Sequence, residues 1–309
     1  MQATSRQCCI YTDIFKELKQ IMVEKFLIIG QGRIGKPLSL KLADTYAVHT
    51  VARSHHQYDN PAICLHQKDA ATLHADELMG VTHLVIIIAP NKARATANHR
   101  QAYQESYWRI CRHLADLAAD SRWRYRLKQV LFVSSTAVYG ENAGETINEN
   151  TPAVPTTPTA QILLDSEKVL QQAFGKKAVI VRAAGIYHHA STRLIDQARQ
   201  AYQHGVPSHH YTNRIFADDL VNVLYQIVLT DQPKPIYLAC DGVSVSSFEL
   251  LAFLATRLGF LPPACMISPP TGKKIVPNID TGLLQFANYQ AGYDEIIKNL
   301  TVQHNKKVP

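Results

Sequence analysis

The sequence predicts an α/β fold of the Rossmann type, in which helices cover both faces of a doubly wound parallel sheet and a smaller C-terminal lobe is attached. Residues 25–53 combine an apolar run, a glycine-rich turn, a segment without helix breakers and a second apolar run, as in a βαβ unit. Apolar runs of strand length then alternate with helical segments as far as residue 240. Beyond residue 242 short helices broken by prolines replace this alternation, and they predict the smaller lobe.

The overall composition is that of an ordinary globular protein. The 309 residues are 46% hydrophobic and 18% charged, which allows two lobes and a large core. The net charge of +7 could attract nucleic acid or an anionic small molecule, but no RRM, KH or helix-turn-helix signature supports nucleic-acid binding. No apolar stretch is long enough to span a membrane. We therefore expect a protein that binds neither nucleic acid nor membranes.

The cysteine pattern indicates a reduced, cytoplasmic protein. The six cysteines form no CxxC pair, and they show no spacing with the histidines that is typical of a metal site, so we expect no bound metal. Residues 1–22 carry charges through their only apolar region and lack the core of a signal peptide. We expect an N-terminal extension there, either an amphipathic helix or a non-native leader if translation begins at Met22.

The sequence GQGRIG at residues 30–35 predicts a phosphate-binding turn, because a strand precedes it and a helix follows it. Gly30 would permit the tight turn, Gly32 would let a pyrophosphate approach the backbone, and Gly35 would let the helix pack closely on the strand. The amide groups that open the helix, near Arg33 and Ile34, would bind the phosphates at the positive end of the helix dipole. These residues together predict a dinucleotide cofactor.

The residue after the second strand of this unit indicates which dinucleotide is bound. An acid there would accept hydrogen bonds from the adenosine ribose and favour NAD, whereas this chain has Arg53. A guanidinium suits a 2′-phosphate, and Arg33 could assist it. We therefore predict a preference for NADP(H), with NAD(H) left open. The alternative is that Arg53 is a solvated surface residue.

The strands and helices after the first unit follow in a regular order. The apolar run at 82–89 predicts a central strand buried on both faces, and it ends at Ala89 and Pro90 on the carboxyl edge of the sheet, where we expect contact with the cofactor. The remaining elements are predicted as strands at 62–66, 129–133, 178–182 and 236–240, helices at 70–79, 93–120, 160–174 and 192–204, and a helix capped by Asp218 or Asp219. A polar linker is predicted at 140–158.

Several short motifs occur in a fixed order along the chain. They are GQGRIG at 30–35, VSSTAVYG at 133–140, VRAAGIY at 181–187, RIFADDL at 214–220, IYLACDG at 236–242 and GKKIVPN at 272–278. In this order they resemble the extended or atypical short-chain dehydrogenase/reductase superfamily, in its epimerase and dehydratase branch. The resemblance implies a Rossmann lobe, at 23–186 and 211–241, and a small substrate lobe, at 187–210 and 242–309, with the active site between them.

The same resemblance suggests catalytic residues. The family's catalytic serine stands four residues before the tyrosine of the VYG element, which here makes it Ser135, and Ser134 beside it would contact the cofactor. The family's YxxxK pair falls on Thr159 and Leu163, and neither side chain can shuttle a proton as a phenol beside an ammonium does.

A substitute acid would therefore have to supply the proton. Tyr139 and Tyr187 are the first candidates because they lie near strand ends, followed by His188 and Asp165. The glycine spacing also departs from that of most extended members, because Ile29 and Gly30 stand where a glycine and another residue are usual. The chain resembles most closely those members that lack YxxxK.

Two functions remain open. The first is an NADP(H)-binding epimerase/dehydratase-like oxidoreductase that acts on a sugar-like or nucleotide-linked small molecule. The second is a non-catalytic module that senses NADP(H) and regulates a partner protein, which the loss of YxxxK favours. A homodimer is left open.

Overall fold

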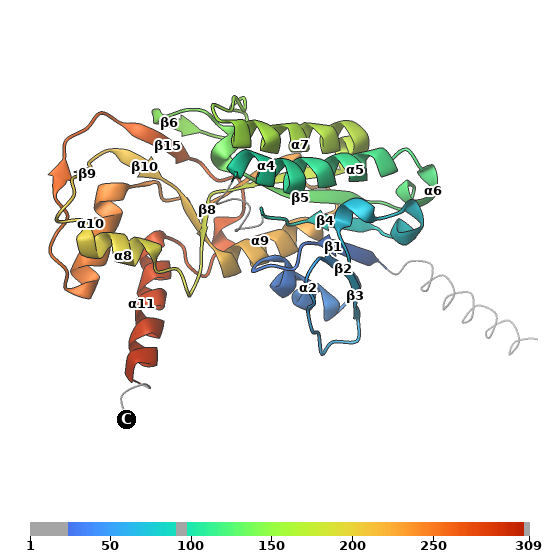
Figure 1. Ribbon diagram of the computed structural model, residues 1–309, viewed down its shortest axis with the longest axis horizontal. Helices are drawn as coiled ribbons and strands as arrows, with labels where there is room; N and C mark the ends of the chain where they lie inside the picture. Colours follow the sequence, from blue (N-terminus) through green and yellow to red (C-terminus); the bar gives the residue numbers. More distant parts are fainter. Residues whose placement is uncertain (1–23, 91–97, 306–309) are drawn as a thin grey trace, which may run out of the picture.

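The computed structural model describes residues 24–90 and 98–305, and it confirms the predicted Rossmann-type architecture (Figure 1). Seven parallel strands form the main sheet in the order β12-β7-β5-β4-β1-β2-β3. Their bounds in that order are Ile236–Ala239, Ala178–Ala183, Gln129–Ser135, His83–Ile86, Lys25–Ile29, Ala47–Ala52 and Ile63–Gln67. The strand order reverses between β1 and β4, and in sheets of this kind ligands bind outside the carboxyl ends of the strands at such a point.

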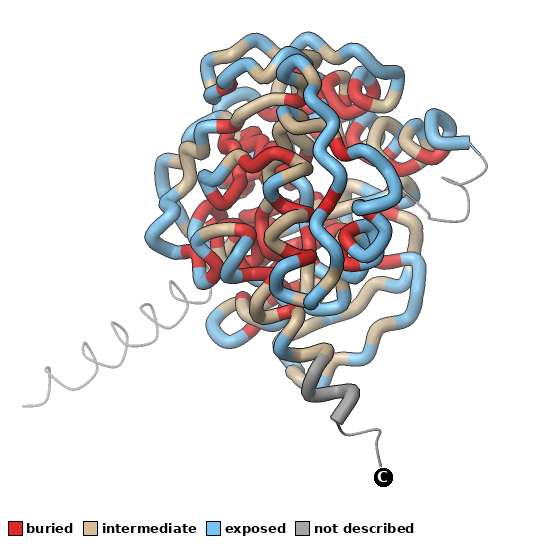
Figure 2. The backbone as a smooth tube through the Cα atoms, turned by 90° about the vertical axis from the view of Figure 1, so that its left-hand side faces the viewer, coloured by how far each residue is buried: buried red, intermediate tan, exposed pale blue. Residues whose placement is uncertain are grey.

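Helices cover both faces of the main sheet. On one face α2 (Gly35–Ala43) and α9 (Ala217–Val228) bury their leucines against the sheet, and on the other α5 (Arg109–Leu117) and α7 (Pro158–Phe174) do the same. Figure 2 shows the buried residues gathered inside these layers. With both faces covered, the strand ends are where polar side chains can meet a ligand.

A smaller sheet and a helical cluster form the rest of the molecule, drawn at the left of Figure 1. The strands β13 (Val245–Ser246), β10 (His210–Thr212), β15 (Thr271–Ile275) and β6 (Ala143–Ile147) make a four-stranded sheet. Three helices, α8 (Arg193–Gln200), α10 (Ser247–Leu258) and α11 (Tyr289–Asn305), pack around a separate apolar core. The strand β6 belongs to the segment predicted as a linker at 140–158, so this part of the prediction was wrong.

Short elements complete the structure. Two further parallel pairs are β11 (Arg214–Phe216) with β8 (Gly185–Tyr187) and β14 (Cys265–Met266) with β9 (Val206–Pro207). The remaining short helices are α6 (Ser121–Arg124), η4 (Thr136–Val138), η5 (Gly175–Lys177) and η6 (Thr281–Leu283).

Two predicted helices are divided in the structure. The helix expected at 70–79 is replaced by two 3₁₀ turns, η1 (Ala70–Thr72) and η2 (Ala75–Leu78), because Asp69 caps the first and a capping box of His74 and Glu77 starts the second.

The long helix expected at 93–120 is also divided. It consists of α4 (His99–Tyr103), a π-helical turn η3 (Gln104–Trp108) and α5, and its first residues, 93–97, lie outside the described part. Within the π turn the Ser106 hydroxyl donates to the carbonyl of Ala102 at 2.6 Å, a bond that competes with regular helical pairing.

The predicted cap of α9 was also wrong. Phe216 occupies the N-cap position, and Asp219 is buried one turn further on. Its carboxylate accepts the amides of Gln285 at 2.7 Å and Phe286 at 3.0 Å. Asp219 therefore ties the C-terminal segment to α9 instead of capping the helix.

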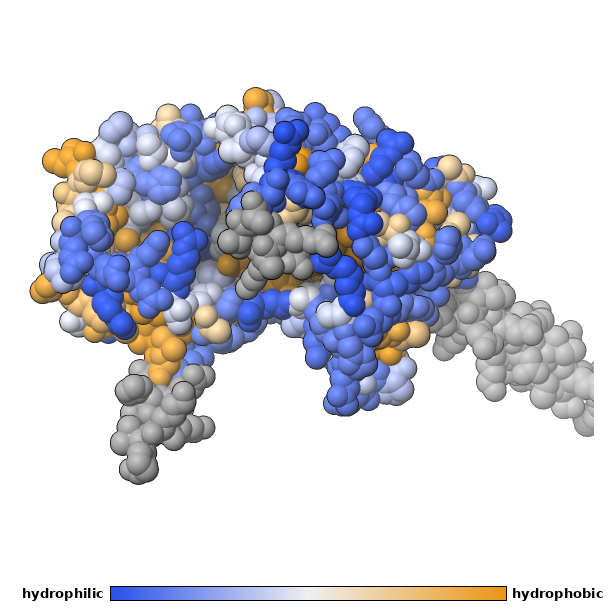
Figure 3. All heavy atoms as spheres, in the orientation of Figure 1, coloured by the Kyte–Doolittle hydropathy of each residue, from blue (hydrophilic) through white to orange (hydrophobic). Residues whose placement is uncertain are grey.

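The surface agrees with the composition. The face drawn in Figure 3 is largely hydrophilic. No helix in the described residues is long and apolar enough to cross a membrane. The predicted extension at 1–22 lies outside the described residues.

Candidate cofactor and active site

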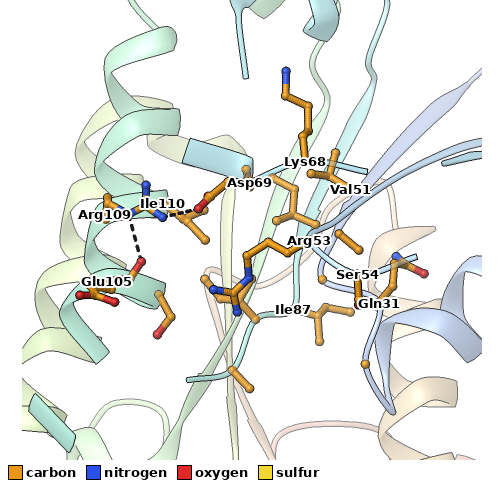
Figure 4. Close-up of a pocket in the computed structure, with 18 of the residues that line it drawn as sticks. Gln31, Val51, Arg53, Ser54, Lys68, Asp69, Ile87, Glu105, Arg109 and Ile110 are labelled. Atoms are coloured by element: carbon orange, nitrogen blue, oxygen red, sulfur yellow. Dashed lines mark hydrogen bonds and ion pairs between the residues drawn. The ribbon is translucent and has the colours of Figure 1, made fainter. Parts of the chain in front are cut away.

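A cavity of about 280 Å³ opens at the carboxyl ends of β1, β2 and β4, next to the glycine turn (Figure 4). Four of the predicted cofactor residues line it, namely Gly30, Gly32, Arg53 and Ala89. Side chains from the beginning of η1 and from η3 and α5 form the opposite wall. The cavity thus lies where the strand order reverses, as the sequence pattern implies for a ligand site.

The three glycines of the turn differ in their surroundings. Gly30 has a φ of +95°, and a Cβ added there would lie 1.9 Å from the carbonyl oxygen of Ile87. A Cβ on Gly35 would lie 1.9 Å from the carbonyl oxygen of Gly30, whereas one on Gly32 would meet no atom of the described residues within 4 Å. Gly30 and Gly35 are therefore required by the protein itself, and Gly32 faces open space that a ligand can fill.

The side chain of Gln31 stabilises the glycine turn through hydrogen bonds, a role that the sequence did not predict. Its side-chain oxygen accepts hydrogen bonds from the hydroxyls of Ser39 at 3.1 Å and Tyr58 at 2.5 Å. Gln31 lines the cavity between Gly30 and Gly32, and its side chain is buried. Because it occupies a variable position of the glycine motif, no spacing rule identifies it.

Arg53 reaches into the cavity from the end of β2 (Figure 4). Opposite it, Asp69 Oδ2 pairs with Arg109 Nη2 at 2.5 Å, while the amide of Ala71 donates to Asp69 Oδ1 at 2.9 Å. Burial by itself would raise the pKa of Asp69, but the Ala71 amide and the Arg109 guanidinium together hold it below its usual value. The Arg53 charge also lowers the pKa of Asp69, although no hydrogen bond or ion pair of the Arg53 side chain is found within residues 24–90 and 98–305.

Asp69 and Arg109 were not identified from the sequence. Asp69 lies two residues after the end of β3, and the rule that ligands gather at the carboxyl ends of parallel strands would have singled it out. Arg109 begins α5 and reaches the site only through tertiary packing.

The other predicted cofactor residues do not line this cavity. Ile34 has its side chain in the apolar core beside α2, and Gly35 lies beneath the turn. Arg33 is exposed outside the cavity, and Pro90 is half-buried beyond its rim. The hydroxyl of Ser134 turns inward and donates to Glu167 at 2.5 Å, so the predicted contact of its side chain with the cofactor is not supported.

Ser135 ends β5 at the same edge of the sheet, and it is half-buried. Its hydroxyl oxygen accepts the amide of Ala137 at 3.1 Å and caps the turn η4. The oxygen is thereby held at the strand end, but Ser135 does not line the cavity described above, and its catalytic role stays a prediction.

Tyr139 belongs to the interior and not to an open site. It is 1% exposed, and its hydroxyl accepts a hydrogen bond from Arg182 Nη1 at 2.7 Å. Arg182 is in turn paired with Glu167 at 2.7 Å, and both are almost fully buried. Burial raises the pKa of the Tyr139 phenol, although the Arg182 charge acts in the opposite direction. The geometry speaks against the predicted role of Tyr139 as a proton donor, because the Arg182–Glu167 pair occupies its polar end.

Tyr187 is also enclosed. It stacks on Tyr293 with ring centroids 5.0 Å apart, and a Cβ on Gly292 would lie 2.0 Å from its hydroxyl oxygen. That hydroxyl has no hydrogen-bond partner within the described residues, and burial, followed by the nearby carboxylate of Asp241, raises its pKa. A phenol with a raised pKa and no access to solvent is a poor acid or base, so the predicted role of Tyr187 is not supported.

The structure also shows the surroundings of the two positions where the family has its YxxxK pair, and of the two remaining candidates for the proton donor. Thr159 is half-buried in the first turn of α7, and Leu163 is packed inside with 2% exposure. Asp165 accepts the amide of Gln161 at 2.8 Å on the outer side of α7, and His188 Nδ1 accepts the amide of Ala190 at 3.1 Å.

Three comparisons with known proteins agree with the fold. The model of the NAD dependent epimerase/dehydratase family matches residues 26–238. Protein YeeZ of Escherichia coli (strain K12) is 22% identical over 261 residues, which are 81% of this chain and 90% of that protein.

Two solved structures have the same fold. A Methylobacillus flagellatus protein, provisionally assigned as an NAD-dependent epimerase/dehydratase, is 26% identical with a TM-score of 0.70, over 90% of this chain and 99% of the other. The UDP-glucuronic acid 4-epimerase of Bacillus cereus, solved in complex with NAD, is 15% identical with a TM-score of 0.65, over 89% of this chain and 99% of the other.

Proposed function

The chain belongs to the NAD dependent epimerase/dehydratase family, whose members are NAD(P)-dependent enzymes, and from this premise we propose that it uses NADP(H) to convert a sugar-like or nucleotide-linked small molecule. The observation that carries the proposal is the Arg53 guanidinium, which reaches into the cavity beside the glycine turn without a hydrogen bond or ion pair in the described residues. When bound, the dinucleotide supplies hydride transfer at its nicotinamide ring.

The cavity fits the phosphates of such a cofactor. The open space above Gly32 admits a pyrophosphate, and the N-terminal end of α2 favours its negative charge. Arg53 would then pair with a 2′-phosphate on the adenosine ribose. The Asp69 carboxylate attracts Arg53 electrostatically, but it forms its ion pair with Arg109, which leaves the Arg53 guanidinium free to form an ion pair with that phosphate.

The substrate class is inferred from the family and from the serine. The structural relative of Bacillus cereus is named for UDP-glucuronic acid, and a sugar hydroxyl or carbonyl of that kind suits the hydroxyl of Ser135. In our proposal Ser135 binds the reacting oxygen. Neither Tyr139 nor Tyr187 carries the proton, because both phenols are enclosed in the core.

Titration with NADPH and NADH tests the cofactor assignment. We expect NADPH to bind at least tenfold more tightly, and Arg53→Gln to remove most of that difference, because a charge-assisted hydrogen bond contributes about 1.5–3 kcal/mol. Arg33→Gln is the matched control, since Arg33 is exposed but lies outside the cavity, and it should change either affinity by less than about threefold. Equal affinities for the two nucleotides in the wild type would refute the role of Arg53.

Turnover is tested separately with a panel of nucleotide-linked sugars. Ser135→Ala should lower kcat about 10²-fold or more while leaving the dissociation constant of NADPH unchanged. One alternative is favoured by a specific observation, the enclosure of both candidate tyrosines: a non-catalytic module that reports the NADP(H) redox state to a partner. Cofactor binding without turnover across the panel, together with a partner whose binding depends on that redox state, would favour this alternative.

The same samples give the oligomeric state by light scattering, and a homodimer is the state we propose.

A further inference from the structure

Three side chains that commonly bind metals lie together on β2 and β3, away from the cofactor cavity. They are His49, Cys64 and His66, and one potential ligand atom from each lies within 4.8 Å of the other two. His49 Nδ1 and His66 Nε2 are 2.8 Å apart, and the two rings are stacked with centroids 5.1 Å apart. Cys64 is exposed and both imidazoles are half-buried, so a cation can reach the cluster from solvent.

The sheet register explains why the sequence did not reveal this cluster. Residues two apart on a strand share a face, which puts Cys64 and His66 side by side on β3. His49 is the direct neighbour of Cys64 on the adjoining strand β2. The ligands thus come from two strands joined by a long loop, and no local spacing of cysteine and histidine marks them.

The donor set of the cluster suits a metal of the zinc class. Imidazole nitrogen and cysteine sulfur are ligands that zinc takes in tetrahedral sites. His49 and His66 would supply two nitrogens, and Cys64 would supply the sulfur.

We propose that His49, Cys64 and His66 form a binding site for a thiophilic divalent cation of the zinc class, with a fourth position open to water. Two nitrogens on one tetrahedral zinc lie about 3.3 Å apart, and a nitrogen and a sulfur about 3.6 Å, given the usual bond lengths of about 2.0 and 2.3 Å. To bind the ion, the imidazoles would move apart by about half an ångström, and Cys64 would close in by at most about one ångström through a change of its side-chain torsion.

Lys25 limits the affinity of this site. Its ammonium interacts electrostatically with both Cys64 and His49. A positive charge there repels a dication. Lys25→Gln should therefore bind zinc more tightly than the wild type.

The location suggests what the cation does. The strand β3 is the outer strand of the sheet and pairs only with β2 in that sheet. A cation bound by His49 and His66 would link β2 and β3 and stabilise this edge of the sheet. The same strands end next to Arg53 and Asp69 in the cofactor cavity, three or four residues further on and thus about 10–13 Å away.

Cobalt and zinc binding to the full-length protein tests the site. Titrated with Co²⁺ under reducing conditions, the wild type should show visible d–d bands and a near-ultraviolet thiolate-to-cobalt band at one ion per chain, and Zn²⁺ should remove both. Cys64→Ser should lose the thiolate band, and His66→Gln should weaken binding at least tenfold. Cys265→Ser is the matched control, because Cys265 is also an exposed free cysteine but lies in another sheet, and it should leave the bands unchanged.

Two further results decide the outcome. Cys8 and Cys9 lie outside the described residues, so a Cys8→Ser/Cys9→Ser variant must keep the thiolate band. Circular dichroism of the apo variants must match the wild type, and a saturating amount of Zn²⁺ should raise the Tm of the wild type but not that of Cys64→Ser. The proposal is wrong if Cys64→Ser retains the thiolate band, or if the wild type binds cobalt no more tightly than His66→Gln.

Discussion

The glycine-turn end and the serine end of the molecule lie along one edge of the same sheet, yet their polar groups are arranged differently. At the glycine turn, Gly32 and Arg53 face an open cavity, and the polar groups around it are exposed or paired at its rim. Near Ser135, the polar groups of Tyr139 and Tyr187 are enclosed, one hydrogen-bonded to Arg182 and the other without a partner in the described residues.

This difference shows which properties of a site a sequence motif can predict. The glycine motif acts through backbone geometry, which the fold reproduces wherever the strand, turn and helix occur. The role of a tyrosine depends instead on what surrounds its hydroxyl, and a buried ion pair or a close helix can remove it from solvent. The four predictions below test that contrast, from the largest expected effect to the smallest.

Glu167→Gln should destabilise the protein most. The substitution leaves the Arg182 charge buried without its carboxylate, which costs about 3–5 kcal/mol of unfolding free energy in comparable pairs. Asp165→Asn is the control on the same helix, because Asp165 is half-buried and, among the described residues, hydrogen-bonded to the side chain of Gln161 alone, and it should cost less than about 0.5 kcal/mol. Urea unfolding measures both, and similar losses would show that the buried network does not stabilise this end.

Alanine at two glycines of the turn should give opposite phenotypes. Gly30→Ala should cost at least about 2 kcal/mol of stability, because its φ is positive and the methyl group meets a carbonyl oxygen. Gly32→Ala should change stability by less than about 0.5 kcal/mol but weaken dinucleotide binding tenfold or more, since the methyl group enters the space for the pyrophosphate. If Gly32→Ala binds normally, no phosphate lies there.

Asp241 should make the enclosed region sensitive to pH. Burial raises the pKa of this carboxyl to about 7, and its Oδ2 has no partner in the described part of the chain. The native state therefore keeps a proton that the unfolded chain releases near pH 4. This proton contributes stability that is fully present below about pH 4 and is lost as the pH rises from about 4 through 7.

Asp241→Asn removes this titration while keeping the oxygen that accepts the Val243 amide. Between pH 5 and 8 the wild type should lose about 2–3 kcal/mol relative to the variant. Denaturant unfolding at both pH values measures the difference, and parallel curves would show that Asp241 is ionised throughout.

Tyr187→Phe should have the smallest effect. Because the hydroxyl lacks a hydrogen bond, its removal should leave stability unchanged or raise it by up to about 1 kcal/mol. Turnover should also be unaffected if the phenol takes no part in catalysis. A large loss of kcat without a loss of stability would restore the role that the sequence suggested for Tyr187.

The sequence predicted the fold better than the site, for identifiable reasons. The βαβ unit and the buried strands follow from apolar periodicity and glycine placement, which are local properties. The strand β6 escaped prediction because its pairing with β15 depends on residues more than a hundred positions away. Asp69, Arg109 and the cluster of His49, Cys64 and His66 likewise become visible only once distant strands are side by side.

The strand β6 also has a mechanical consequence. Residues 136–142 leave the main sheet at Ser135 and enter the small sheet at Ala143, so they form a short strap between two bodies. A strap of this length has little slack. Any rotation of the small sheet would therefore displace the turn at Ser135. A molecule bound by the smaller lobe would in this way change the orientation of the Ser135 hydroxyl in the other lobe.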